Sequence, residues 1–133
     1  MEPYVPRVAD SELRVLKILW DNPPLSAREV TNALYPRTTN SDIGTVQTLL
    51  QRLEAKRLVR RDRRQHVHRF VPTVSREEFA GRQLEAMADK LADGSVAPLL
   101  SHLVQSAKLT DAERLELRRL LDEPPTTKRR GAR

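Results

Sequence analysis

The chain of 133 residues contains no cysteine, only four glycines and few aromatic side chains. Without thiols it can form neither disulfide bonds nor thiolate metal sites. Because only 4% of the residues are aromatic, a hydrophobic core must be built from aliphatic side chains. The four glycines are scattered, so the chain has no glycine-rich loop of the kind that cradles phosphates.

Long apolar runs are missing as well. No stretch approaches the roughly 20 apolar residues of a membrane span, and the first residues, Met-Glu-Pro-Tyr-Val-Pro, do not resemble a secretion signal. We therefore predict a cytoplasmic protein. Neither H-E-x-x-H nor G-x-S-x-G occurs, and most acidic residues fall on the polar faces of predicted helices. These absences predict a protein that is not an enzyme and has no cofactor.

The charge that is present is unevenly distributed. The net charge is +6 and the pI about 10.3. Residues 1–73 hold 13 Lys and Arg against 8 acids, residues 74–123 hold 7 against 10, and residues 124–133 hold 4 against none. A basic front half favours an anionic partner, most often nucleic acid. The slightly acidic back half is not expected to lie on phosphates.

One stretch, residues 39–72, combines a helix with a basic hairpin. Apolar residues recur at helical spacing from Ile43 to Leu58, and the other face carries hydroxyl and amide side chains. Two short extended runs, 58–61 and 66–71, follow around a basic tip. Hydroxyls and amides can bond base edges, and arginines can neutralise phosphates. The pattern predicts a winged helix-turn-helix, mostly α with a small β-hairpin.

Two shorter helices precede this stretch. The first is expected to be capped by Asp10 or Ser11 and to use Trp20, the only tryptophan, as a core anchor. The second opens with the capping box Ser26-x-x-Glu29. The third helix is expected to be capped by Ser41. The face of the second helix predicted to be buried consists of Ala27, Val30, Ala33 and Leu34.

The back half reads as three further helices. Ser75-x-x-Glu78 and Thr110-x-x-Glu113 form capping boxes, and Ser95 is expected to start the middle helix. Three such helices cannot bury all their apolar residues on one another, so we predict a homodimer. The domains expected are a DNA-binding domain at 8–73, a dimerisation domain at 74–123 and a disordered basic tail at 124–133. The residues assigned to dimerisation are Leu84, Met87, Leu91, Leu99, Leu100, Leu103, Leu117, Leu120 and Leu121.

His66 and His68 are two residues apart on the predicted second strand, so they would share a face and could hold a metal. No third ligand lies nearby in the sequence, and a zinc site needs at least three protein ligands. A structural role is favoured, and we predict no metal site.

Three segments together resemble the penicillinase-repressor family of transcriptional regulators (the BlaI/MecI/CopY type). They are Asp10-x-Glu12-Leu13-x-Val15-Leu16-x-Ile18-Leu19-Trp20, then Thr45-Val46-Gln47-Thr48-Leu49-Leu50-x-Arg52-Leu53-x-x-Lys56-x-Leu58-Val59, then His68-Arg69-Phe70-x-Pro72. The occurrence of all three segments in this order is far more specific than any one of them. The resemblance extends over about residues 8–123.

The resemblance implies a homodimeric repressor that binds a palindromic double-stranded DNA operator with its third helix in the major groove. Thr45 and Thr48 match groove-facing threonines of the family. Gly44 and Gln47 stand where the antibiotic-resistance repressors carry Lys and Arg, which implies a different operator sequence. Base contacts are thus assigned to these four positions. The predicted DNA-backbone contacts are Ser41, Gln51, Arg52, Arg60, Arg61, Arg63 and Arg64.

The resemblance also bears on induction. The antibiotic-resistance repressors are cleaved at an Asn-Phe bond in the penultimate helix, which implies a membrane sensor protease as inducing partner. Here the corresponding pair is His102-Leu103, so the chain departs from the family at that bond. The copper-responsive branch uses C-terminal cysteines, which this chain lacks. Two other classes stay open: a regulator that responds to a small molecule bound between its two domains, and a winged helix used as a protein-protein adaptor.

Overall fold

The computed structural model describes residues 5–106 and 109–123. These residues divide into two compact units, the first ending at Met87 and the second beginning at Ala88. The predicted tail, 124–133, lies outside the described residues. The elements are α1 (Asp10–Asp21), α2 (Ala27–Leu34), α3 (Asn40–Ala55), β1 (Val59–Asp62), β2 (Arg69–Pro72), α4 (Arg76–Leu91), α5 (Ala97–Ser106) and α6 (Asp111–Asp122).

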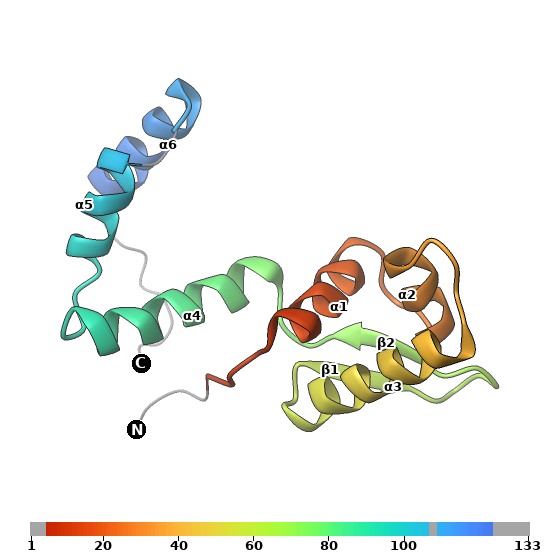
Figure 1. Cartoon of the computed structure of the whole chain (residues 1–133). Helices are drawn as coiled ribbons and strands as arrows, with labels where there is room; N and C mark the ends of the chain where they lie inside the picture. Colours follow the sequence, from red (N-terminus) through yellow and green to blue (C-terminus); the bar gives the residue numbers. More distant parts are fainter. Residues whose placement is uncertain (1–4, 107–108, 124–133) are drawn as a thin grey trace. The chain divides into compact units, whose positions relative to one another are not determined.

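The first unit has the element order of a winged helix: α1, α2 and α3 followed by a hairpin (Figure 1). Strands β1 and β2 pair antiparallel, with Arg61 opposite Phe70. Leu25 adds a third short strand segment, because its N–H and C=O both bond the backbone of Phe70 at 3.2 and 2.8 Å. The predicted fold class is confirmed. The predicted domain boundary at 73/74 falls before α4, most of which belongs to the first compact unit.

The core of the first unit is aliphatic, as the composition requires. Phe70 is the one aromatic side chain in it; Trp20 packs at its edge, donates from Nε1 to the carbonyl of Val74 at 2.8 Å, and lies 5.6 Å from the Phe79 ring. The predicted role of Trp20 as an anchor is confirmed. The buried core residues are Val15, Leu16, Leu19, Val30, Val46, Leu49, Leu50, Leu53, Leu58, Val59, Phe70 and Val74.

Glu12 joins three segments of this unit. Its side chain is only 3% exposed, and Oε1 accepts from Ala9 N at 3.0 Å and from Lys56 Nζ at 2.6 Å. Lys56 Nζ also donates to the carbonyl of Arg7 at 2.6 Å. Burial alone would raise the pKa of the Glu12 carboxyl, but the hydrogen bonds from Lys56 and Ala9 outweigh it and lower that pKa. The N-terminal arm, α1 and the end of α3 are thereby tied together.

Two of the predicted capping boxes are complete. Ser26 and Glu29 satisfy each other's backbone N–H at 2.8 and 3.1 Å, and Thr110 and Glu113 do so at 2.9 and 3.1 Å. At the start of α4, Ser75 Oγ accepts from Glu78 N at 3.0 Å, which is half of the predicted box.

Two predicted helix starts were wrong. Helix α1 is capped at Ala9 rather than at Asp10 or Ser11, because Glu12 reaches back to the Ala9 N–H. Helix α3 is capped by Thr39 rather than by Ser41: Thr39 Oγ1 accepts from Asp42 N at 3.0 Å, and Asp42 faces the Thr39 N–H. Both helices therefore begin earlier than predicted.

Three smaller predictions were also wrong. On α2, Ala33 is exposed and Thr31 is buried, its hydroxyl donating to the Ala27 carbonyl at 2.7 Å. The positions 27, 30, 31 and 34 form the better helical stripe. Helix α5 starts at Ala97, although Ser95 Oγ does accept from Ala97 N at 3.4 Å. His66 and His68 lie in the hairpin loop before β2, both exposed, and so do not share a strand face.

In the second unit the helices carry exposed apolar side chains. Leu91, Leu115 and Leu121 are 70%, 67% and 77% exposed. Within the helices α4, α5 and α6 as the structure describes them, only Ala88 is buried. None of the helices in the described ranges is long and apolar enough to cross a membrane, and those ranges contain no cluster of three His, Asp or Glu side chains that could hold a metal ion.

Candidate nucleic-acid interface

Helix α3 turns its apolar side inward and leaves a polar face exposed. Val46, Leu49, Leu50 and Leu53 are buried and fix the rotation of the helix. The opposite face is made of small or uncharged polar residues and ends in one arginine. It is formed by the predicted contact residues Ser41, Thr45, Gln47, Thr48, Gln51 and Arg52, all exposed, with Gly44 half-buried beside them.

The two threonines of this face have their hydroxyl hydrogens engaged. Thr45 Oγ1 donates to the carbonyl of Ser41, and Thr48 Oγ1 to that of Gly44, each at 3.1 Å. Each side chain therefore presents to solvent a methyl group and an oxygen that accepts. Those groups suit the methyl of thymine or the amino group of adenine or cytosine.

Gly44 and Gln47 are two positions of this face at which packing does not restrict the side chain. A Cβ built at Gly44 would meet no atom within 4 Å outside its own helix backbone, so packing does not require glycine there. Glycine inside a helix costs about 1 kcal/mol relative to alanine. Gln47 is exposed and offers both a donor and an acceptor, which is the pairing that an adenine edge accepts.

The four predicted wing arginines differ in availability. Arg60 is exposed, and Arg63, 64% exposed, lies 3.9 Å from Glu54 Oε2. Arg64 donates from Nε and Nη2 to the two carboxylate oxygens of Asp62, at 3.0 and 2.8 Å. Those hydrogen bonds lower the pKa of Asp62 far below its usual range.

Arg61 differs from the others because it joins the hairpin to α3. Its Nη2 donates to Glu54 Oε1 at 3.0 Å, and its guanidinium lies 4.9 Å from the centre of the Phe70 ring. Its side chain is 21% exposed, and Nε is buried without a hydrogen-bond partner. This arginine was predicted to bind phosphate, but the structure places it in the joint between α3 and the hairpin.

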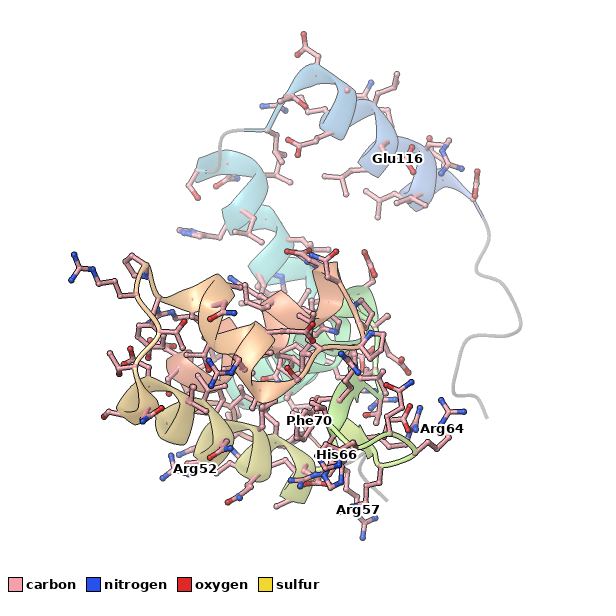
Figure 2. All side chains as sticks on the ribbon, turned by 90° about the vertical axis from the view of Figure 1, so that its right-hand side faces the viewer. Arg52, Arg57, Arg64, His66, Phe70 and Glu116 are labelled. Carbon is pink, nitrogen blue, oxygen red and sulfur yellow. The ribbon has the colours of Figure 1, made fainter. Side chains whose placement is uncertain are left out.

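A groove of about 750 Å³ separates the wing from α2 and α3. Gln47 and Gln51 line one side and His66 and His68 the other, so the groove joins the polar face of α3 to the hairpin loop. Figure 2 shows the labelled His66 and Arg64 in that hairpin region.

Two basic residues of this groove were missed by the sequence reasoning. Arg28 lies in the first turn of α2, and Arg69 on β2 lies 3.6 Å from Glu29 and donates to Gln65 Oε1 at 2.9 Å. The backbone N–H of Ser26, more than Arg69, lowers the pKa of Glu29. Arg28 follows the capping residue Ser26 by two positions. That position was the available signal in the sequence, because helix N-termini often face anions.

A family model described as penicillinase repressor matches residues 8–123, which is nearly the whole of the described chain. The chain belongs to the penicillinase-repressor family. This family consists of transcriptional regulators, so the prediction that the chain is a regulator and not an enzyme is confirmed.

Three transcriptional regulators or repressors of known name align with the chain. The transcriptional regulator BlaI of Mycobacterium tuberculosis is 36% identical over 119 residues, covering 88% of this chain and 84% of that protein. The penicillinase repressor of Bacillus licheniformis is 23% identical over 125 residues, covering 94% and 97%. The HTH-type transcriptional regulator MgrA of Staphylococcus aureus is 34% identical over 83 residues, covering 61% and 53%.

Proposed function

We propose that the chain is a dimeric repressor that binds a two-fold symmetric operator, with α3 of each copy in the major groove and the wing on the phosphate backbone. The observation that carries this proposal is the exposed hydroxyl and amide face of α3 beside an arginine-bearing hairpin. Thr45, Gln47 and Thr48 would read bases, while Arg52, Arg60 and Arg63 would neutralise phosphates.

The second copy in this proposal covers the apolar side chains of the back half. Leucines as exposed as Leu91 and Leu121 are unfavourable in water, at about 25 cal/mol per Å² of apolar surface. Large apolar side chains exposed on three successive helices, as here on α4, α5 and α6, are typical of a protein-protein interface. A dimer would place two α3 helices about 34 Å apart, which is one turn of DNA.

The proposal is tested by titrating the purified protein onto DNA at several salt concentrations. Binding should weaken steeply with salt, with a log-log slope of about −0.9 for each neutralised phosphate. Replacing Arg60 and Arg63 together by Ala should weaken binding to every sequence and flatten that slope. The matched control replaces Arg114 and Arg118 on α6, which removes the same charge from the other unit.

An adaptor that uses its winged helix for protein contact would show no salt-dependent DNA binding in this titration. If the wild type binds but the wing variant keeps its affinity and slope, the hairpin does not contact phosphate.

A second candidate, a regulator released by a small molecule, is favoured by a groove between α1 and the start of α4. It holds about 450 Å³, is mostly apolar, and carries Lys17 and Arg76 at its edge. Arg76 lies 5.5 Å from the centre of the Trp20 ring and pairs with Asp21 at 2.8 Å. An amphipathic organic anion would suit this lining.

Induction by a sensor protease is the competing route. The pair His102-Leu103 lies within α5, where both side chains are exposed in the single chain. A denaturing gel during induction distinguishes the routes, because a ligand would release DNA with the chain intact and a protease would shorten it.

A further inference from the structure

The turn that ends α3 has the hydrogen bonds of a Schellman motif. Arg57 N donates to Glu54 O and Leu58 N to Leu53 O, both at 3.0 Å, and Leu53 and Leu58 are both buried. In this motif the residue after the C-cap adopts a left-handed conformation and is usually glycine. Here that residue is Arg57, with φ of 65°.

The backbone of this turn gives no reason for an arginine. A residue with a Cβ is disfavoured at positive φ, whereas glycine adopts it freely. The Arg57 carbonyl accepts from Thr73 Oγ1 at 2.7 Å, a contact that glycine would make equally well. An unfavourable conformation at one residue points to a use for its side chain.

The side chain of Arg57 is exposed, and among the described residues its guanidinium has no hydrogen-bond or ion-pair partner. In this it differs from Arg61, Arg64 and Arg69, whose charges are all engaged within the chain. Figure 2 shows Arg57 and Arg52 projecting from the lower edge of the first unit, the edge at which α3 lies.

We infer that Arg57 is a phosphate-binding residue of the DNA interface, kept at a backbone position that favours glycine. The inference rests on the proposed function and extends the interface beyond the wing tip to the junction of α3 and β1. Arg52 and Arg57 would then flank the end of the recognition helix, on a line of backbone contacts separate from that of the hairpin tip.

Three substitutions separate the charge from the conformation. Arg57→Gly removes both the guanidinium and the conformational conflict, Arg57→Ala removes only the guanidinium, and Arg57→Lys keeps a positive charge without relieving the conflict. Arg14→Ala, an exposed arginine on α1, is the control for loss of one charge elsewhere in the first unit. Each variant of the full chain is measured for its melting temperature and for the salt slope of binding to a random-sequence duplex.

Arg57→Gly should melt about 2–5 °C higher than wild type, since glycine relieves the left-handed strain but loses more chain entropy on folding. Its salt dependence should become flatter, with the magnitude of the log-log slope smaller by about 0.9 for each copy on the DNA. Arg57→Ala should lose the same slope without the rise in melting temperature. Arg57→Lys and Arg14→Ala should keep slopes close to wild type.

A higher melting temperature with an unchanged slope for Arg57→Gly would overturn the inference, because Arg57 would then be a tolerated surface residue. An unchanged melting temperature would overturn the claim that the position favours glycine. The proposed function fails by a different result, namely wild-type protein that shows no salt-dependent binding to any duplex.

Discussion

The two units of this chain differ in how far their leucines are buried. In the first unit Leu16, Leu19 and Leu50 are fully buried, whereas in the second Leu91 and Leu121 are mostly exposed. The helices of the second unit are no worse formed, since Thr110 and Glu113 complete a capping box there. Capping is a local signal, but helices this short owe most of their stability to packing against neighbours. A second copy of the chain is the proposed neighbour.

The largest expected effect comes from shortening a buried leucine of the first unit. Leu50→Ala should lower the free energy of unfolding by about 2–5 kcal/mol, because it leaves a cavity that the surrounding core cannot fill. Urea unfolding followed by far-UV circular dichroism measures the change. Leu121→Ala, the same substitution at an exposed leucine, should leave the unfolding of the first unit unchanged. Equal losses of unfolding free energy for both variants would show that the two units share one core.

The proposal that a second copy covers the exposed apolar residues of the second unit is tested by Leu103→Asp on α5. If Leu103 is covered by a second copy, a buried unpaired carboxylate should shift the chain from dimer to monomer. Sedimentation equilibrium measures the mass, and Gln105→Asp introduces the same residue at a polar position of the same helix. A chain that is monomeric before substitution, or dimeric after it, contradicts the proposed interface.

A smaller effect concerns the carboxylates of the two units. The pKa of Glu12 is lowered in the fold, so its contribution to stability is present above the unfolded pKa, about 4.3, and is lost as the pH falls through the folded pKa. Glu12→Gln should destabilise the protein by about 1.5 kcal/mol at pH 7. The difference from wild type should shrink in urea titrations at pH 3–4.

The matched carboxylate in the second unit is Glu116, which accepts from Arg119 at 2.6 Å on the surface of α6. The hydrogen bond from Arg119 lowers its pKa as well, but exposed ion pairs contribute little. Glu116→Gln should therefore leave the unfolding midpoint unchanged at both pH values. If it costs as much as Glu12→Gln, the pair is covered in the assembled protein.

The last expected change is one of sequence preference and leaves stability unaltered. Gln47→Ala removes the only amide at the centre of the α3 face and should cost about 1–3 kcal/mol at one base pair of the bound site. Nonspecific affinity should hardly change, because no phosphate contact is lost. The check is selection from a random library, and an identical selected motif for both proteins argues against base reading by Gln47.

Much of the fold could be predicted because its signals are local. Helical spacing of apolar residues, the Ser26-Glu29 box and the basic hairpin all lie within short stretches. The errors arose where two local choices compete: Thr39 and Ser41 can both cap α3, and Ala33 and Thr31 both border the buried stripe of α2. A small hydroxyl residue that bonds its own helix backbone can be buried, which composition does not reveal.

The site was predictable by type and less so by residue. Periodicity alone identified the polar face of α3, since the buried leucines fix its rotation. The partners of the arginines depend on contacts between α3 and the hairpin, so the pairing of Arg61 with Glu54 could not be read from spacing. Arg57 was overlooked because left-handed conformation at a helix end is visible only in the backbone.

The most direct test of the central claim, a two-unit chain that reads DNA as a dimer, is selection of genomic fragments bound by the purified full-length protein. The account predicts enriched sites with two-fold symmetry and half-site centres about 34 Å apart, one turn of the duplex. Enrichment of single, unsymmetric half-sites would contradict the dimer, and no enrichment over random fragments would contradict DNA reading altogether.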